Sequence, residues 1–177
     1  MDYYNKKIYL AKVDKKDKDC GKIERWAAHR QGVLHRAFTV CLFYEGQVVM
    51  QHRRHLVFDG VFDLTCSSHP VIVKEKIQAD KDAAYDTLRR EWSIAKINLK
   101  SKLNHEGSVY YKAEDPNSKY TEHEVCHLFV ASTDKLPSPN FEFAYGFSLV
   151  LKDRLKTDYS LLIPNIAPWV PPLMKLL

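Results

Sequence analysis

One segment of this 177-residue chain carries the full set of signals for an α-helix: residues 78–94, QADKDAAYDTLRREWSI. Asp80 suits the N-cap position, and Asp86 can pair with Arg90 one helical turn later. Apolar side chains recur at every fourth position of one face; these are Ala84, Leu88 and Trp92. This is the one convincing helix of the chain, so most of the remaining core has to come from strands.

The other apolar segments are short and rich in β-branched and aromatic residues, which is typical of strands. The clearest, residues 35–53, predicts two strands around a tight turn at residues 45–47, where Gly46 supplies the turn conformation. The further expected elements are an edge strand at 7–13, a brief helical segment at 22–30, strands at 61–66, 108–113, 122–132 and 141–147, and a short helix beginning near Ser148, before a proline-punctuated tail. The pattern is that of an α+β chain with a mixed sheet and few helices.

Length and composition favour a single domain over residues 1–177, with residues 1–21 as an N-terminal extension and edge strand. No apolar stretch follows a basic segment near residue 1, so we expect no secretory signal. No apolar run approaches the roughly 18 residues of a membrane span. The four cysteines form no CxxC pair. We therefore expect reduced thiols in a cytoplasmic protein. We also expect a monomer.

The formal net charge is +5, and much of the positive excess lies in residues 5–22, where lysines are mixed with aspartates. No nucleic-acid-binding motif follows this segment, so we expect no nucleic-acid partner. A mildly basic surface suits a small polyanion, such as a diphosphate, equally well.

Two carboxylates stand two positions apart in TEHEVCHLF, residues 121–129. In a strand, Glu122, Glu124 and Cys126 share one face, where neighbouring side chains lie about 7 Å apart. Two carboxylates so placed repel each other unless a cation or a proton lies between them. The alternative is a solvated strand face.

Three histidines fall where loops meet apolar segments: His29, His35 and His69. Together with the two glutamates they make a suitable ligand set for a divalent cation such as Zn²⁺ or Mn²⁺. Each histidine taken alone is more often a structural residue, and the spacing does not show that the five converge. Glu91, late in the helix, could bind Mg²⁺ that arrives with a diphosphate; the alternative is a plain surface glutamate.

The segment FDLTCSSHP, residues 62–70, places a thiol and a hydroxyl side by side. In an extended chain neighbouring side chains point to opposite faces, so only one of Cys66 and Ser67 can share a pocket with His69. Ser67 lies two residues before the histidine and is the one expected to face it.

Together these segments resemble the type I isopentenyl-diphosphate isomerases, a branch of the Nudix superfamily, over about residues 22–171. AAHRQGVLHRAFTVCLF is similar to the family's opening segment, and DGVFDLTCSSHP to P-G-x-W-T-N-x-x-C-x-H-P. EHEVCHLF is similar to E-x-E-V-C, and APW to S/T-P-W. The resemblance implies a Nudix-type mixed β-sheet sandwich with flanking helices. It also implies an isomerase of isoprenoid biosynthesis that interconverts isopentenyl and dimethylallyl diphosphate.

The same resemblance implies roles for individual residues. One Zn²⁺ or Mn²⁺ would be held by His29, His35, His69, Glu122 and Glu124. Mg²⁺ would bind with the diphosphate at Glu91, and the substrate would be bound by Arg25, Arg53 and Trp169. Glu124, with Tyr111 near it, would be one proton-transfer partner, and the Trp169 indole would stabilise a tertiary carbocation.

The opposite proton-transfer partner of the family is a cysteine, and Ser67 occupies its position. A thiol titrates within about two units of neutral pH, whereas a serine hydroxyl does not titrate in a useful range. Three outcomes stay open: a β-bulge turns Cys66 inward, Ser67 or water substitutes at a lower rate, or isomerisation is lost.

Two alternatives belong to other functional classes. A Nudix hydrolase of a diphosphate substrate relies on R-E-x-x-E-E-x-G, whose clustered glutamates bind several Mg²⁺ ions. The segment REWSIAK keeps only the first of these glutamates, which disfavours hydrolysis. The other alternative is a non-catalytic relative that binds a metal or a diphosphate.

Overall fold

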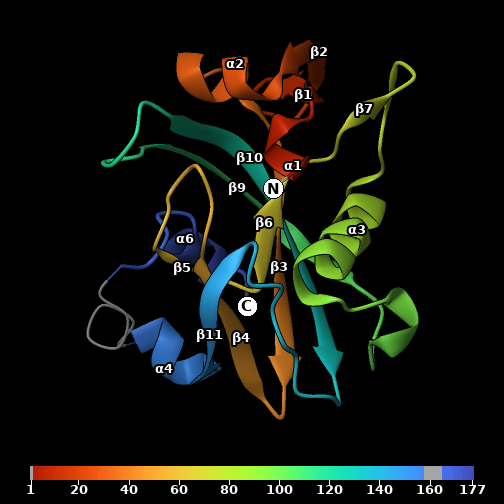
Figure 1. Ribbon diagram of the computed structural model, residues 1–177, viewed down its shortest axis with the longest axis vertical. Helices are drawn as coiled ribbons and strands as arrows, with labels where there is room; N and C mark the ends of the chain where they lie inside the picture. Colours follow the sequence, from red (N-terminus) through yellow and green to blue (C-terminus); the bar gives the residue numbers. More distant parts are fainter. Residues whose placement is uncertain (1, 158–164) are drawn as a thin grey trace.

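The computed structural model describes residues 2–157 and 165–177. In chain order its elements are α1 (Asp2–Asn5), β1 (Tyr9–Val13), β2 (Asp19–Glu24), α2 (Arg25–Gln31), β3 (His35–Tyr44), β4 (Gln47–Arg53), β5 (Phe62–Asp63), β6 (Cys66–Ser68), β7 (Ile72–Val73), β8 (Lys76–Ile77), α3 (Asp80–Trp92), a 3-10 turn (Lys96–Asn98), β9 (Asn104–Glu114), β10 (Thr121–Thr133), β11 (Ala144–Leu151), α4 (Lys152–Thr157) and α6 (Val170–Met174). A mixed sheet separates α3 on one face from α4 and α6 on the other (Figure 1). The predicted α+β class is confirmed.

Strand β3 is the centre of the sheet. It runs parallel to β10 along its whole length, from Glu124 opposite His35 to Thr133 opposite Tyr44. Its other edge pairs antiparallel with β6 and, further along, with β4. The sheet continues through β4 to β11 on one side and through β10 to β9 on the other. These pairings bring the start of β3, the start of β10 and the end of β6 to the same region.

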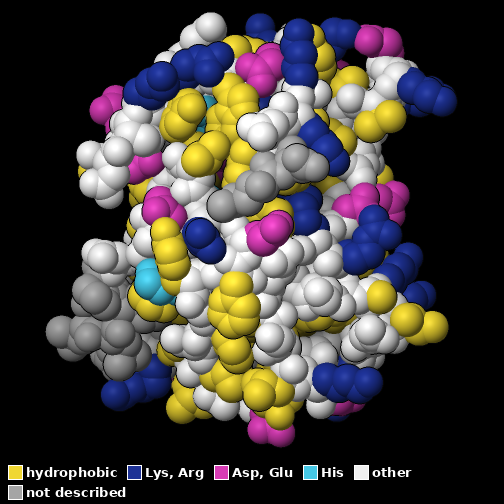
Figure 2. All heavy atoms as spheres, viewed as in Figure 1, with side chains coloured by type: hydrophobic (Ala, Val, Ile, Leu, Met, Phe, Trp, Pro, Cys, Tyr) yellow, Lys and Arg dark blue, Asp and Glu magenta, His cyan; other side chains and the backbone are white. Residues whose placement is uncertain are grey.

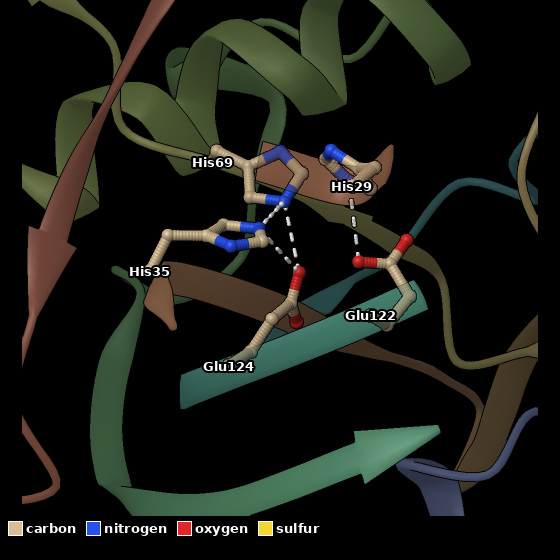
Figure 3. Close-up of side chains that lie close together, drawn as sticks. All are labelled: His29, His35, His69, Glu122 and Glu124. Carbon is tan, nitrogen blue, oxygen red and sulfur yellow. Dashed lines mark hydrogen bonds and ion pairs between the residues drawn. The ribbon is translucent and has the colours of Figure 1, made fainter. Parts of the chain in front are cut away.

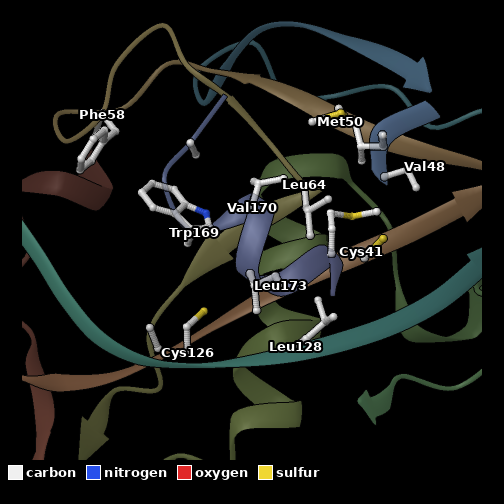
Figure 4. Close-up of a cluster of buried hydrophobic side chains, with 14 of the residues drawn as sticks. Cys41, Val48, Met50, Phe58, Leu64, Cys126, Leu128, Trp169, Val170 and Leu173 are labelled. Carbon is white, nitrogen blue, oxygen red and sulfur yellow. The ribbon is translucent and has the colours of Figure 1, made fainter. Parts of the chain in front are cut away.

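The alternation of β3 side chains divides the core into two clusters. Ala37 and Cys41 face α4 and α6, in the cluster that Figure 4 shows with Leu128, Trp169 and Leu173. The α3 face of the sheet buries a second set: Phe38, Val40, Leu42, Ala84, Leu88 and Trp92. Burying one large apolar side chain contributes about 1.5–3 kcal/mol to folding, so the packing on each face stabilises the sheet.

Helix α3 confirms the expected buried face, since Ala84, Leu88 and Trp92 are at most 2% exposed. Its N-terminus differs from the prediction: Ala79 is the N-cap residue, and Asp80 begins the helix itself. The predicted ion pair of Asp86 with Arg90 is also wrong. Asp86 pairs with Arg89 at 3.2 Å, and Arg90 turns toward a pocket described below.

The N-terminal half shows two differences from the expected elements. Strand β1 is not at the edge of the sheet, because β2 pairs along its outer side. Residues 22–24 therefore belong to β2, and the expected helical segment begins only at Arg25. Glu24 ends the strand and caps the helix, accepting hydrogen bonds from the backbone N–H groups of Trp26 and Ala27.

The hairpin within residues 35–53 is confirmed, with Glu45 and Gly46 at φ 47° and 78° between β3 and β4. The predicted strand at 61–66 is instead two short strands, β5 and β6, separated by residues 64–65. The helix expected from Ser148 is wrong there: β11 continues to Leu151, and α4 follows it. The proline-rich tail contains α6; residues 163–164 of that tail lie outside the described residues.

The surface seen in Figure 2 carries Lys and Arg side chains interspersed with acidic and apolar ones, not gathered into one stripe. Among residues 2–157 and 165–177, every helix is too short or too polar to cross a lipid bilayer.

Candidate functional site

The five residues considered as metal ligands converge at one point (Figure 3). One ligand atom from each lies within 4.8 Å of every other. They come from four parts of the chain: His29 from α2, His35 from the start of β3, His69 from just after β6, and Glu122 and Glu124 from β10. Four of the five are buried, and His69 is intermediate.

Strand pairing explains the convergence. The parallel register of β3 with β10 sets Glu124 directly opposite His35. The antiparallel register of β3 with β6 sets Ser68 opposite Phe38, so that His69 emerges beside the first residues of β3. Helix α2 packs against β10 and brings His29 over Glu122, at 3.2 Å between Nε2 and Oε2.

The imidazoles are oriented for metal binding. His29 Nδ1 lies 2.7 Å from the Arg25 carbonyl oxygen, and His35 Nδ1 lies 2.7 Å from that of Val33. A carbonyl oxygen only accepts, so each Nδ1 carries a proton and each Nε2 points toward the centre, where a metal ion would displace any proton that this nitrogen carries. Glu124 Oε1 lies 3.4 Å from His35 Nε2 and 2.8 Å from His69 Nε2. Three imidazole nitrogens and two carboxylates fit a borderline divalent metal.

The charges of the cluster are strongly coupled. Burial lowers the pKa of His29, but the charge and the hydrogen bond of Glu122 outweigh it and raise that pKa to about 9. Burial and then the two other imidazoles hold the pKa of His69 well below its usual value. Burial raises the pKa of Glu124. The hydrogen bond and the charge of His35 lower it and contribute to a net downward shift.

A pocket opens beside this cluster. The six other residues assigned to the site from the sequence all line it; they are Arg25, Arg53, Ser67, Glu91, Tyr111 and Trp169. Four of the five cluster residues line it as well, namely His29, His69, Glu122 and Glu124. The sequence assignment did not include several further lining residues: Tyr3, Tyr4, Trp26, His55, Ser68 and Arg90.

One side of the pocket is rich in guanidinium groups. Arg25 Nη2 donates to the carbonyl oxygens of Tyr3 and Tyr4 at 3.1 and 3.0 Å. Its Nε and Nη1, and the Nε of both Arg53 and Arg90, are buried without a hydrogen-bond partner among the described residues. Unpaired buried donors are costly, and a bound anion would satisfy them.

Glu91 lies among these cations and is fully buried, so the surface-glutamate alternative is wrong. Its Oε1 accepts from Arg90 Nη2 at 2.8 Å, and its Oε2 accepts from Gln51 Nε2 at 3.2 Å. Its burial follows the spacing of the helix, because position 91 shares a face with Leu88 and Trp92. That same spacing could have indicated that the helix faces the pocket at its C-terminal end.

Ser67 and Cys66 separate as the strand geometry predicts. The β3–β6 register is continuous, with Thr39 opposite Ser67 and Val40 opposite Cys66. Ser67 lines the pocket, whereas the Cys66 thiol packs in the cluster beneath α3. Burial raises the pKa of the Cys66 thiol well above its usual value. The β-bulge alternative is therefore wrong, and the hydroxyl faces the pocket.

Aromatic groups form another wall. The Tyr111 hydroxyl donates to Glu124 Oε2, and its ring lies 5.7 Å from that of Trp169. Burial and the charge of Glu124 hold the pKa of Tyr111 well above its usual value. Tyr111 therefore stays protonated as a donor to the carboxylate.

Helix α1 supplies two tyrosines over the basic side, which no pattern in the sequence indicated. The Tyr3 ring lies 4.1 Å from the Arg90 guanidinium and 4.8 Å from that of Arg25. The Tyr4 hydroxyl lies 2.8 Å from His55 Nδ1. The first residues of the chain thus form part of the pocket.

Comparison with known sequences identifies relatives that share one enzyme name. No family model matches the chain. It is 31% identical over 131 residues to an isopentenyl-diphosphate Delta-isomerase of Pectobacterium atrosepticum, covering 72% of this chain and 68% of that protein. It is 32% identical over 150 residues to isopentenyl-diphosphate Delta-isomerase 1 of Photorhabdus laumondii, covering 80% and 78%. The corresponding Streptomyces griseus isomerase is 34% identical over 76% of this chain and 66% of its own length.

Solved structures agree on the fold. A Deinococcus radiodurans protein has a TM-score of 0.70 at 15% identity, covering 94% of this chain and 97% of its own. A MutT NUDIX hydrolase from Burkholderia pseudomallei has a TM-score of 0.57 at 13% identity, covering 81% and 98%. At these identities the likeness concerns the fold alone, and it confirms the expected Nudix-type architecture.

Proposed function

Since this chain belongs to the isopentenyl-diphosphate Delta-isomerase family, we propose that it interconverts isopentenyl diphosphate and dimethylallyl diphosphate. The observation that carries the proposal is the meeting of five metal-ligand side chains beside a pocket with two different sides. One side has unpaired guanidinium donors, and the other has aromatic rings and proton-transfer groups. A five-carbon diphosphate has the same division into an anionic and an apolar end.

The basic side would bind the diphosphate. Arg25 and Arg90 have unpaired nitrogen donors at the pocket, and charge-assisted bonds to phosphate oxygens are strong. Arg53 contributes less than expected, because its Nη1 and Nη2 already donate to Asp63 and to the Val57 carbonyl. Glu91 would hold a Mg²⁺ ion that accompanies the diphosphate.

The five-residue cluster would hold one Zn²⁺ or Mn²⁺ through His29, His35, His69, Glu122 and Glu124. When bound, the ion would fix the position of Glu124 and adjust its proton affinity. Tyr111, which donates to the other carboxylate oxygen, would hold Glu124 from the second side.

Isomerisation moves a double bond by adding a proton at one carbon and removing one at another. We assign Glu124 to one proton transfer and Ser67, which lines the same pocket, to the other. The tertiary carbocation between the two steps would lie against Trp169, whose indole face attracts a cation. Buried walls protect that cation from water.

The test is deuterium exchange from D₂O into isopentenyl diphosphate, measured for the wild type and for Ser67→Cys. We expect exchange in the wild type and a rate at least about 10-fold higher in Ser67→Cys, because a thiol is a far better acid and base near neutral pH. Phosphate release in place of exchange would indicate a hydrolase. Binding of metal and diphosphate without exchange in either protein would indicate a non-catalytic relative.

A further inference from the structure

One buried amide in contact with the pocket residues has only half of its hydrogen bonds. Gln51, on β4, is fully buried, and its Nε2 donates to Glu91 Oε2 at 3.2 Å. Its Oε1 is buried without a donor among the described residues. A carboxylate oxygen accepts hydrogen bonds, so the amide turns its N–H toward Glu91 and leaves its own oxygen unpaired. An apolar side chain of similar size would avoid the free-energy cost of that buried acceptor.

The backbone position of Gln51 is fixed by the sheet. Residue 51 pairs with Phe147 of β11 on one side and with Asp63 of β5 on the other. Its backbone N–H also donates to the Leu64 carbonyl oxygen at 3.3 Å. A side chain on such a constrained backbone is suited to hold a partner in one place.

The Glu91 side chain has one other hydrogen-bond donor among the described residues, Arg90 Nη2, at 2.8 Å from Oε1. His55 Nε2 lies 3.8 Å from Oε2, which is too far for a hydrogen bond. Arg90 lines the pocket and is proposed to bind the diphosphate, so the substrate competes for its donors. Gln51 is not part of the pocket lining formed by the described residues, so its bond to Glu91 faces no such competition.

These contacts are compatible with the Mg²⁺ ion assigned to Glu91. Mg²⁺ prefers oxygen ligands and is usually bound through one or two carboxylates together with phosphate oxygens and water. Each carboxylate oxygen of Glu91 accepts one hydrogen bond from the protein, so each keeps a lone pair for an ion.

We propose that Gln51 is a positioning residue for the diphosphate site. Its amide holds Glu91 Oε2, so that the carboxylate keeps one direction toward the Mg²⁺ ion that accompanies the diphosphate. The proposal rests on the proposed function, in which Glu91 binds that ion. The unpaired Oε1 follows from this role, because only the amide N–H is used.

The experiment measures the binding of inorganic pyrophosphate to the full-length chain by isothermal titration calorimetry, with and without MgCl₂. Gln51→Met keeps the length of the side chain without its amide. We expect its affinity with MgCl₂ to fall about 10-fold, which corresponds to one hydrogen bond to a charged group. Without MgCl₂ the affinity should change less than about 2-fold, because the basic side of the pocket is intact. Gln47→Met, at the first residue of β4 and outside the pocket lining, is the matched control and should change neither.

A double-mutant cycle tests whether Gln51 acts through Glu91. Glu91→Gln removes the anionic ligand, and adding Gln51→Met to it should lower the affinity with MgCl₂ by less than about 2-fold more. Additive losses would show that the amide acts independently of the carboxylate, and would contradict the proposal.

Gln51→Asn is the second variant, since it keeps a buried amide if Gln51→Met fails to fold. Its side chain is one methylene shorter, so it should melt cooperatively and lose the same Mg²⁺-dependent part of the affinity. Equal losses with and without MgCl₂, or full affinity in either folded variant, would overturn the proposal. A wild type that gains no affinity from MgCl₂ would refute the assignment of the ion to Glu91 and the role of Gln51 with it. The D₂O exchange assay tests the isomerase function separately.

Discussion

Neighbouring residues on β6 serve different parts of the molecule. Ser67 faces the pocket, and Cys66 fills the core under α3. We expect Cys66→Ala to lower the free energy of unfolding by about 1–2 kcal/mol, because it leaves a small cavity in a packed cluster. The D₂O exchange rate should stay at the wild-type level, since the thiol does not reach the substrate.

Urea denaturation and the exchange assay measure the two effects separately. Loss of exchange in a Cys66→Ala protein that still folds would mean that the thiol, and not Ser67, takes part in the chemistry.

The alternation of side chains along a strand is enough, from the sequence alone, to place Ser67 and Cys66 on opposite faces. It could not show what else surrounds Ser67. The hydroxyl lies 2.8 Å from Thr39 Oγ1, and that contact depends on β6 pairing with β3, which no period within residues 62–70 indicates.

At the scale of the elements, two neighbouring arginines near the end of α3 lie in different surroundings. Arg90 lines the pocket and donates to Glu91, whereas the Arg89 side chain is 72% exposed. We expect Arg90→Met to weaken the binding of inorganic pyrophosphate with Mg²⁺ by about 10- to 100-fold, which corresponds to one charge-assisted hydrogen bond.

Arg89→Met is the matched control and should leave pyrophosphate affinity unchanged. Isothermal titration calorimetry measures both variants. Equal affinity of the Arg90→Met protein and the wild type would exclude this arginine from the anion site.

Strand β10 carries two of the five proposed metal ligands. We expect Glu122→Gln to lower the affinity for Zn²⁺ or Mn²⁺ by about 10- to 100-fold, because it removes an anionic ligand facing His29. Glu114→Gln, an exposed position on the neighbouring strand β9, is the control.

Elemental analysis after gel filtration, and metal titration of the chelator-treated protein, measure the effect. Full metal content in Glu122→Gln at the same affinity as the control would remove Glu122 from the proposed ligand set.

The elements themselves were predicted unevenly from the sequence. The periodicity of α3 and the alternation of β10 were strong because one face of each is buried. The error at residues 22–24 arose because β2 is largely exposed and carries no apolar alternation. The error after Ser148 has a similar cause: β11 is only partly buried, so its pattern did not distinguish a strand from a helix.

At the scale of the whole molecule, buried thiols make the fold sensitive to high pH. Burial raises the pKa of Cys41 from 9.0 to about 12. The folded state therefore keeps a proton that the unfolded chain has already lost above pH 9. This contribution is fully present below pH 9 and is lost as the pH rises toward 12.

We expect the free energy of unfolding to fall over this range, with Cys41 contributing up to about 1.4 kcal/mol per pH unit. Urea midpoints at pH 7, 9 and 10.5 test it. Cys41→Ala, although less stable at pH 7, should show a shallower decline. A slope identical to that of the wild type would show that this thiol does not titrate with unfolding.

The convergence of the five cluster residues could be suspected from the sequence but not demonstrated from it. His29 and Glu122 are 93 positions apart, and their contact depends on helix α2 packing against β10. The contribution of the α1 tyrosines to the pocket was even less predictable from the sequence. Nothing in the composition of the first residues distinguishes a segment that covers a pocket from one that does not.

The attachment of α1 has a practical consequence for observing this protein in solution. Trp26 Nε1 donates to the Tyr4 carbonyl at 3.1 Å, and the indole lies 4.3 Å from the Arg25 guanidinium. The other two tryptophans are almost completely buried in the core. Trp26 is thus a natural optical probe of this contact: its fluorescence would change, without any added dye, if the position of α1 against the indole changed.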